Sequence, residues 1–481
     1  MLDKRQFYID GTWTDPLAGQ DLEVIDPSTE DAFAVISLGA EADTDLAVAA
    51  ASAALPGWMY TDPADRLALV TRILECYGAR AEDMAKAISQ EMGAPIDLAT
   101  SSQAAAGYSH IKNFIKAFEH VRFIEPLGDH APDDRILREA VGVCALITPW
   151  NWPMNQVTLK VIPALLAGCT MVLKPSEIAP VSSMIFAEIL HEAGTPPGVF
   201  NLVNGDGAGV GTQLSRHPEV DMVSFTGSTR AGIAISKNAA ESLKRVHLEL
   251  GGKGANIIFA DADDKAVRRG AMHCFQNTGQ SCNAPTRMLV QREIYDQSVD
   301  AAVAAAEATQ VGLASEKGRH IGPLVSAAQF EKVQGLIETG INEGARLAAG
   351  GLGRPEGFNR GYFVRPTVFA DVHNDMTIAR EEIFGPVLSI IPFETEDEAI
   401  RIANDTPYGL TNYVQSQDGA RRNRLARKLR SGMVEMNGKS RGAGSPFGGM
   451  KQSGNGREGG VWGIEDFLEV KSVSGWDGSA A

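Results

Sequence analysis

Cys282 lies in a polar stretch of the chain, and such a setting is less typical of a structural cysteine than of a reactive one. It stands in Phe275-Gln-Asn-Thr-Gly-Gln-Ser-Cys-Asn-Ala-Pro-Thr-Arg287. Apolar residues at helical spacing precede this segment and a short apolar run follows it, so we expect Cys282 on a loop between a helix and a strand. A thiolate is a nucleophile, and helix ends beside a polar loop can lower a thiol pKa. Taken alone, such a cysteine is more often an inert turn residue, so the rest of the chain must decide.

Five predicted strands between residues 141 and 250 each end in residues suited to chemistry. Apolar runs of this kind are typical of buried parallel strands, and segments with helical spacing separate them. The predicted strands are 141–147, 170–174, 199–203, 221–225 and 245–250, and the predicted helices are 155–167, 182–193, 208–215 and 229–240. This repeat predicts a doubly wound, Rossmann-like α/β sheet, in which ligands bind at the carboxyl ends of the strands.

The first two strand ends carry an amide and a pair of opposite charges. Thr148–Pro153 contains two prolines and two tryptophans, a rigid loop that presents Asn151, although a plain turn asparagine is the alternative. Lys174-Pro-Ser-Glu177 offers a cation and an acid suited to ribose hydroxyls and phosphate. The alternative for that segment is a helix cap formed by Ser176 or Glu177.

The next three strand ends supply glycines, backbone amides and a carboxyl group. Asn204–Gly211 is glycine-rich before a helix, as phosphate binding requires, but it lacks the dinucleotide fingerprint and could be an ordinary turn. Gly227 and Ser228 place backbone amides at a helix start, where Ser228 could also be the N-cap. Glu249 ends an apolar strand before two glycines, a setting suited to a raised pKa and general-base catalysis, with a buried paired glutamate as the alternative.

The remaining chain predicts scaffold and a second α/β unit. Small hairpins are expected in the first forty residues, and three scaffold helices over Ala42–Leu55, Pro63–Met92 and Ile96–Phe118. Segments 120–125 and 135–140 predict a separate hairpin, and 467–473 a last strand. In the second half, we expect helices at 263–275, 296–309, 326–343, 396–404 and 418–430, with strands at 255–259, 286–290, 387–393 and 410–415.

Composition limits the classes of function. The 481 residues are 44% hydrophobic and 22% charged, which predicts a soluble globular protein of two or three domains. A net charge of -16 argues against nucleic acid and anionic membrane as partners, because both are polyanions. No long apolar stretch or signal segment is found. The five cysteines are widely spaced without a metal-binding pattern, so we expect no metal, free thiols and a cytoplasmic location.

Taken together, the segments resemble the aldehyde dehydrogenase superfamily, from about residue 5 to residue 475. Seven motifs fall in the family's order and spacing: Thr148–Pro153, Lys174–Glu177, Phe225–Ser228, Glu249–Gly252, Gly279–Cys282, Glu381–Pro386 and Pro446–Gly449. The resemblance implies NAD(P)-dependent oxidation of an aldehyde to a carboxylic acid. Cys282 would be the nucleophile that forms a thiohemiacetal and then a thioester. Asn151 and the Cys282 backbone N–H would hold the oxyanion, and Glu249 would activate the hydrolytic water.

The resemblance also assigns a cofactor site along the strand ends. Lys174 and Glu177 would hold the adenosine ribose, Ser228 and its neighbours the pyrophosphate, and Glu382 with Phe384 the nicotinamide ribose and ring. The complete predicted set is Ile147, Thr148, Pro149, Trp150, Lys174, Ser176, Glu177, Gly207, Gly211, Phe225, Thr226, Gly227, Ser228, Leu250, Gly251, Glu382 and Phe384. The Glu177 carboxylate would repel a 2′-phosphate, which favours NAD and leaves NADP as the alternative.

The predicted substrate residues are Trp152, Gln156, Arg441 and Phe447. The loop Asn437–Ser445 corresponds to the mouth of the family's substrate tunnel, and it carries Lys439 and Arg441 where aromatic residues are common. This favours a polar or anionic aldehyde, with a carboxylate held by Arg441. A solvated charge or an ion pair is the equally weighted alternative.

The resemblance divides the chain into three parts and predicts a homodimer or homotetramer. Residues 1–118, 141–250 and 438–463 would form the NAD-binding domain, 251–437 the catalytic domain, and 119–140 with 464–481 the oligomerisation strands.

Three rival functions remain at this stage. The presence of Glu249 favours hydrolysis over transfer to coenzyme A, since acylating members generally lack that glutamate. A cysteine hydrolase would need no nicotinamide, and a binding protein that lost the chemistry would not need Cys282, Glu249 and Asn151 together.

Overall fold

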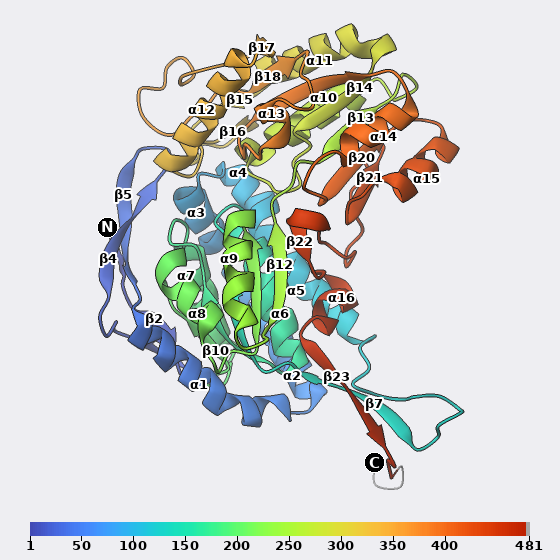
Figure 1. Cartoon of the computed structure of the whole chain (residues 1–481). Helices are drawn as coiled ribbons and strands as arrows, with labels where there is room; N and C mark the ends of the chain where they lie inside the picture. The colour runs from blue at the N-terminus through green and yellow to red at the C-terminus, as the bar shows by residue number, and fades with distance from the viewer. Residues whose placement is uncertain (478–481) are drawn as a thin grey trace.

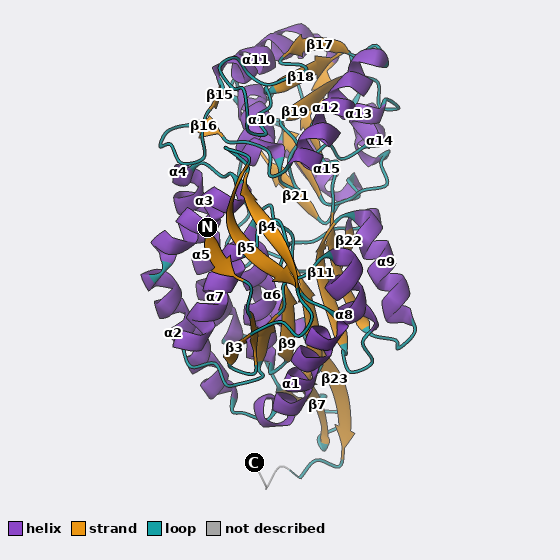
Figure 2. Ribbon diagram, turned by 90° about the vertical axis from the view of Figure 1, so that its left-hand side faces the viewer, coloured by secondary structure: helices purple, strands orange, loops and turns teal. Residues whose placement is uncertain are grey.

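Two helix-covered sheets lie one above the other, and a thin arm projects from the lower one (Figure 1). The computed structural model describes residues 1–477. The upper lobe is built from the second half of the chain and the lower lobe mainly from the first. Strands of both lobes are flanked by helices (Figure 2). The α/β prediction is therefore confirmed for both halves.

The lower sheet has eight strands in the order β22-β12-β11-β8-β9-β10-β2-β3. From β12 to β10 the strands run parallel. They are β2 Phe7–Ile9, β3 Thr12–Thr14, β8 Val143–Ile147, β9 Thr170–Lys174, β10 Phe200–Leu202, β11 Met222–Gly227, β12 Arg245–Leu250 and β22 Gly454–Asn455. The associated helices are α6 Pro153–Ala167, α7 Val181–Glu192, α8 Thr212–Arg216 and α9 Thr229–Ala240.

Both faces of this sheet are buried, which explains why its strands are continuous apolar runs. Along β8, Cys144 and Leu146 pack into one hydrophobic cluster, while the alternate residue Ala145 packs into another. The register pairs Ile147 with Lys174, and Thr226 with Glu249. The predicted strand ends therefore meet at one edge of the sheet.

The upper sheet has seven strands in the order β17-β18-β19-β14-β13-β20-β21. They are β13 Ala255–Ile258, β14 Arg287–Gln291, β17 Arg346–Ala349, β18 Thr367–Ala370, β19 Val387–Phe393, β20 Thr411–Gln415 and β21 Met433–Met436. The helices are α10 Ala266–Phe275, α11 Tyr295–Ala308, α12 Ala327–Asn342, α13 Thr377–Arg380, α14 Glu396–Asn404 and α15 Gly419–Lys428. The predictions missed the short strands β17, β18 and β21. Each has four residues, too few to establish an alternating pattern.

A hairpin near the N-terminus links the lobes. Strands β4 Gln20–Asp26 and β5 Asp31–Leu38 pair with β1 Leu2–Lys4 in a small sheet, and the hairpin lies in front of the lower sheet in Figure 2. At its turn, Glu30 accepts hydrogen bonds from Arg354 and from the Gly361 amide of the upper lobe.

The helix predicted over Pro63–Met92 is two helices, so that prediction was wrong in one respect. The scaffold helices are α1 Glu41–Met59, α2 Pro63–Ala79, α3 Ala81–Met92, α4 Ile96–Leu98 and α5 Ala105–Phe118, with a π-helical turn between the last two. The break falls at Arg80, whose guanidinium forms ion pairs with Glu188 and Glu192 of α7. A tertiary contact fixes the break, and the apolar spacing alone does not reveal it.

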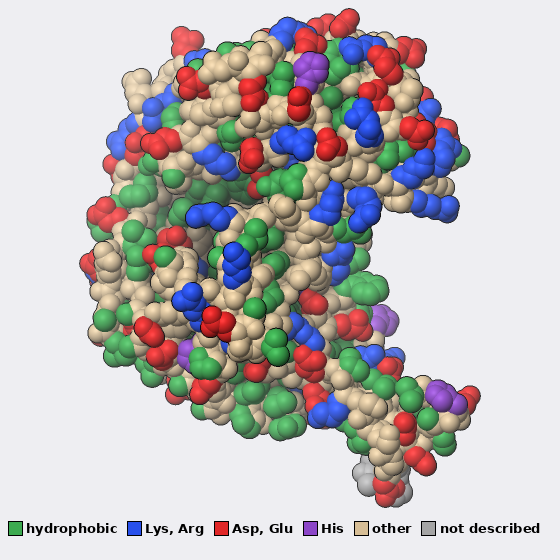
Figure 3. Space-filling view, viewed as in Figure 1, with side chains coloured by type: hydrophobic (Ala, Val, Ile, Leu, Met, Phe, Trp, Pro, Cys, Tyr) green, Lys and Arg blue, Asp and Glu red, His purple; other side chains and the backbone are tan. Residues whose placement is uncertain are grey.

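The arm consists of β6 Ile124–Pro126, β7 Asp134–Ala140 and β23 Leu468–Ser474. It stands away from the body and leaves a concave face between itself and the upper lobe (Figure 3). The strand expected at 120–125 begins only at Ile124. Residues 478–481 of the predicted segment 464–481 lie outside the described residues. A short helix, α16 Gly460–Glu465, precedes β23. Within residues 1–477 no helix combines the length and hydropathy needed to cross a bilayer.

A buried ion pair holds α6 against the C-terminal segment. Lys160 Nζ lies 2.7 Å from Glu458 Oε1 and donates a second hydrogen bond to Ser224. Neither charged side chain is more than 1% exposed. Removing one partner would leave the other charge buried without a counterion.

We expect Lys160→Met to lower the free energy of unfolding by about 3–5 kcal/mol. Lys86→Met is the matched control, because its partner Glu82 and the lysine itself are both exposed, and its cost should stay below about 1 kcal/mol. Denaturant unfolding measures both variants. Equal unfolding midpoints for the two variants would contradict the assignment.

Candidate active site

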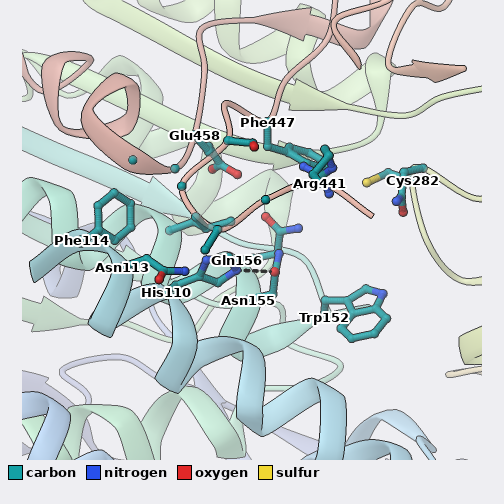
Figure 4. Close-up of a pocket in the computed structure, with 18 residues that line it drawn as sticks. His110, Asn113, Phe114, Trp152, Asn155, Gln156, Cys282, Arg441, Phe447 and Glu458 are labelled. Carbon is teal, nitrogen blue, oxygen red and sulfur yellow. Dashed lines mark hydrogen bonds between the residues drawn. The ribbon is translucent and has the colours of Figure 1, made fainter. Parts of the chain in front are cut away.

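Two cavities meet at Cys282, which alone among the described residues lines both. The first, of about 330 Å³, extends from Cys282 past Trp152 and Arg441 to His110 and Phe114 (Figure 4). The second, of about 220 Å³, lies at the carboxyl ends of β11 and β12, below α12. Cys282 lies between α10 and β14, on the predicted loop. A group bound to its sulfur is therefore accessible from both cavities.

The backbone before Cys282 adopts an unusual conformation that only this sequence pattern permits. Asn277, Thr278 and Gly279 all have positive φ, at 53°, 56° and 73°. A Cβ on Gly279 would lie 2.1 Å from the Gly385 carbonyl, so only glycine fits there. The Gln280 carbonyl accepts hydrogen bonds of 3.1 Å from the Asn277 and Asn151 side-chain amides. The loop is thereby held rigidly beside Asn151.

Asn151 is buried and lines the second cavity together with Cys282. One N–H of its amide donates to Gln280, and no other residue between 1 and 477 accepts from it. Its backbone carbonyl accepts a hydrogen bond from the side-chain amide of Gln103, a buried residue of the π-helical turn. The second N–H of Asn151 remains available to a bound molecule.

The surroundings of Cys282 favour the neutral thiol over the thiolate. Burial, together with the carboxyl groups of Glu382 and Glu249, raises the pKa of Cys282 to about 12 against the opposing effect of Arg441. Burial of the thiol therefore outweighs any lowering of its pKa by nearby helix ends. The carboxyl groups come from segments far apart in the sequence.

Glu249 has the environment predicted for a general base. It ends β12, is 2% exposed, and neither carboxylate oxygen has a hydrogen-bond partner within residues 1–477. Burial, together with the Glu458 carboxylate, raises the pKa of Glu249 to about 7 against the opposing effect of His247 at 3.7 Å. Burial lowers the pKa of His247, but the nearby carboxylates of Asp466 and Glu249 raise it to about 9. The raised pKa places the titration of Glu249 closer to neutral pH than that of an exposed glutamate.

Glu382 and Phe384 close the opposite wall of the second cavity. Glu382 accepts a hydrogen bond of 2.9 Å from the Gly252 amide. Phe384 has a φ of 59° and contacts the edge of Trp150 at a ring distance of 5.4 Å. Gln329 of α12 donates to the carbonyl of Phe384 at 2.8 Å and so stabilises this strained turn.

The Lys174–Glu177 segment lies at the same sheet edge, outside the lining of the second cavity. Lys174 is buried, and its ammonium donates to the carbonyls of Pro175 and Gly205 and to Glu177. All three of its N–H groups are thus committed. Burial lowers the pKa of Lys174. Lys174 therefore positions Glu177, whose side chain is 31% exposed.

The two predicted phosphate-binding turns differ in which backbone amides remain free to bind a phosphate. Ser228 is the N-cap of α9, accepting from the Ala231 amide, so the N-cap alternative is confirmed. In the glycine-rich turn, the amides of Gly209 and Gly211 donate to Asp206. Gly207 is open to solvent. The phosphate assignments of Gly207 and Gly211 stay predictions, with the Gly211 amide already occupied.

The family model for the aldehyde dehydrogenase family matches residues 13–473. The chain belongs to this family. A relative from a Pseudomonas species, named 3-succinoylsemialdehyde-pyridine dehydrogenase, is 53% identical over 481 residues that cover all of both chains.

Solved aldehyde dehydrogenases also superimpose closely on the chain. One from Bartonella henselae gives a TM-score of 0.98 at 63% identity, covering 99% of this chain and 100% of the other. Aldehyde dehydrogenase C from Pseudomonas syringae, a cysteine-to-alanine mutant in complex with NAD+ and octanal, gives 0.96 at 48% identity, covering 98% and 97%.

Within this aldehyde dehydrogenase, the structure gathers many of the predicted site residues. Trp152, Gln156, Arg441 and Phe447 all line the first cavity. The second is lined by the predicted residues Pro149, Trp150, Thr226, Gly227, Ser228, Leu250, Gly251, Glu382 and Phe384. Not in that lining are Ile147, Thr148, Lys174, Ser176, Glu177, Gly207, Gly211 and Phe225.

Sequence reasoning missed several residues that line the aldehyde dehydrogenase cavities. Gln329 and Lys332 line the second cavity from α12. His110 and Asn113 of α5, with Asn155 of α6, line the first. Four of them lie on the amphipathic helices α5 and α12, where a residue facing a cavity has the same pattern as one facing solvent. Asn155 lies at the start of α6, whose other residues are all buried.

Proposed function

We propose that this protein oxidises an aldehyde to a carboxylic acid with NAD as the hydride acceptor. The observation that carries the proposal is that Cys282 lines both cavities. An aldehyde carbon bonded to its sulfur can therefore be reached from the first cavity and from the second. The P. syringae relative with NAD+ and octanal supports this reading. So does the Pseudomonas relative, whose name specifies a semialdehyde.

The residues of the second cavity fit NAD. Glu382 faces Gly251, where a Cβ would lie 2.3 Å from a carboxylate oxygen, so the cavity keeps its width only with glycine. Thr226 has a buried hydroxyl without a partner within residues 1–477. Glu382 and Phe384 would hold the nicotinamide ribose and ring, and Ser228 with Gly227 the pyrophosphate at the start of α9. When bound, NAD supplies the acceptor for a hydride.

The chain's own residues account for the remaining chemistry. The Cys282 thiol gives up its proton and its sulfur bonds to the carbonyl carbon, forming a thiohemiacetal. Glu249, with a pKa of about 7, is the base placed to accept that proton. The free N–H of Asn151 and the Cys282 backbone N–H stabilise the oxyanion. After hydride loss, Glu249 releases the thiol proton to solvent and then deprotonates a water that attacks the thioester. The intermediate releases the carboxylic acid, and the sulfur regains a proton from Glu249.

NADH formation measured by absorbance tests this function directly. Acetaldehyde, benzaldehyde, succinic semialdehyde and betaine aldehyde would be compared with NAD and NADP, with and without coenzyme A. Oxidation without coenzyme A supports hydrolysis, while strict dependence on coenzyme A would establish the acylating alternative. Ester or amide hydrolysis without nicotinamide would establish a cysteine hydrolase. An absence of NAD binding would refute the proposal.

We expect Glu177→Gln to weaken the binding of NAD and to reduce the preference of the enzyme for NAD over NADP. A carboxylate accepts hydrogen bonds from ribose hydroxyls and repels a 2′-phosphate, so its loss should raise the KM for NAD by about tenfold or more. Parallel kinetics with both cofactors measure the change. Glu192→Gln, an exposed partner of Arg80 on α7, is the control. An unchanged KM ratio would place the adenosine ribose elsewhere.

We further propose a cytoplasmic homodimer or homotetramer with the domain division given above. The five cysteines are free, which suits a reducing compartment. The projecting arm offers the edge strands β6 and β23 for pairing between subunits. Light scattering of the full chain and of a chain lacking residues 468–481 tests the assembly.

A further inference from the structure

The one cation that lines the first cavity is already neutralised by an acid. Arg441 Nε lies 3.0 Å from Glu435 Oε1, with the two side chains 31% and 13% exposed. The guanidinium also stacks 4.6 Å from the centre of the Phe447 ring. Lys439, the other cation of this loop, is exposed and does not line the cavity. The predicted cation for a substrate carboxylate is therefore paired within the chain.

The acid and the imidazole of the cavity add no free charge. Glu458 lines it but is paired with the buried Lys160 at 2.7 Å. His110 Nε2 lies 2.8 Å from Asn155 Oδ1, and burial lowers the pKa of His110, so the ring is neutral at neutral pH. Among residues 1–477, no charged side chain that lines this cavity lacks a counterion.

Neutral hydrogen-bonding groups and aromatic rings form the rest of the wall. The side-chain amides of Asn113, Asn155 and Gln156 donate no hydrogen bond to any residue in 1–477. Gln156 is 3% exposed, and its buried Oε1 has no partner there either. Trp152 is fixed by donating from Nε1 to Ser281 at 2.8 Å, and Phe114 lies at the far end (Figure 4). The buried Gln156 amide and the half-buried amides of Asn113 and Asn155 favour a polar but uncharged ligand group.

We propose that the first cavity selects uncharged aldehydes whose far end carries an aromatic ring or a neutral hydrogen-bonding group, with Glu435 as a specificity-determining residue. This inference rests on the proposed aldehyde oxidation. A substrate carboxylate at the mouth would compete with Glu435 for Arg441, and one of the two anions would be left unpaired in a half-buried site. Glu435 thus disfavours aldehydes that carry a carboxylate, because it already pairs with Arg441, the cation that would bind that carboxylate.

An isosteric substrate pair isolates the effect of charge. 4-Formylbenzamide and 4-carboxybenzaldehyde share shape and reactive group, and differ in one negative charge. We expect kcat/KM of the unmodified protein to be about tenfold or more higher for the amide than for the acid. The reason is that the substrate carboxylate would lie near Glu435 at the mouth of the cavity without a cation of its own. A preference for the acid would overturn the proposal.

Four variants test whether charge balance is the cause. Glu435→Gln frees Arg441 and should lower the amide-to-acid ratio of kcat/KM by about tenfold. Arg441→Gln leaves Glu435 unpaired and should raise it. The double variant restores neutrality and should return the ratio to within about twofold of the parent. Glu394→Gln, which removes the same charge from an ion pair outside the cavity, is the control and should leave the ratio unchanged.

The outcomes separate this inference from the proposed function. If both substrates are oxidised but Glu435→Gln changes the amide-to-acid ratio of kcat/KM no more than Glu394→Gln does, the role of Glu435 is refuted. The proposed aldehyde oxidation would still stand. Loss of acid activity in both Arg441→Gln and the double variant would identify Arg441 as a direct carboxylate receptor. No NADH from either substrate or from simple aldehydes would refute the oxidation itself.

Discussion

Cys282→Ala is expected to abolish aldehyde oxidation, with a loss in kcat of at least about 10⁴-fold. Among the described residues, Cys282 alone lines both cavities, so no other nucleophile is placed to form the thioester. The fold should be unaffected, since alanine differs only by the sulfur. NAD binding, followed by calorimetry, should persist. Cys76→Ala is the control: it removes a half-buried thiol on α2 outside both cavities, and its kcat should stay within about twofold of the parent.

The thiol itself gives a readout that does not depend on turnover. With a pKa near 12, Cys282 should react slowly with iodoacetamide at neutral pH, and the rate should rise about tenfold per pH unit below that value. Glu382→Gln should accelerate alkylation, because it removes a carboxyl group that raises the thiol pKa. Mass spectrometry locates the adduct. Fast alkylation that is independent of pH would show that the resting group is a thiolate.

The sequence predicts the sheet edge well because its signals are local. β9 Thr170–Lys174, α9 Thr229–Ala240 and β12 Arg245–Leu250 have the predicted bounds, since apolar runs and helical spacing mark them directly. All of the predicted strand ends belong to one parallel sheet, so Glu249 and Asn151 had to fall at one edge. The doubly wound topology follows from the same alternation.

What sequence reasoning could not give are the contacts between distant segments. The Cys282 pKa depends on burial and on the carboxyl groups of Glu382 and Glu249, which come together only through the fold. Pairing of Arg441 with Glu435 crosses a loop whose path no local pattern predicts. The Gln329 bond to the Phe384 carbonyl likewise joins a helix face to a strained turn. In each case the motif was visible in the sequence, and the partner that sets its chemistry was not.

Glu249→Gln is expected to arrest the second half of the reaction. Glutamine cannot accept a proton, so thioester hydrolysis should slow by about 10²–10⁴-fold, the usual contribution of a general base. If solvent accepts the thiol proton in this variant, one burst of NADH is formed and steady-state turnover then nearly stops. The acyl adduct on Cys282 is then detected by intact-protein mass spectrometry. A variant that lost the burst as well would show that Glu249 is also required to deprotonate the thiol.

The pH dependence distinguishes a base from a merely structural Glu249. Because its folded-state pKa is raised to about 7, hydrolysis by the parent should increase with pH up to about 7 and then level off. The same raised pKa means that Glu249 favours folding at low pH, and that this stability is lost as pH rises through 7. Glu249→Gln should therefore unfold at a higher denaturant concentration than the parent at about pH 8, and the difference should shrink in acid. A variant that is inactive yet more stable at that pH would locate the defect in proton transfer, whereas one that is inactive and less stable would point to disrupted packing.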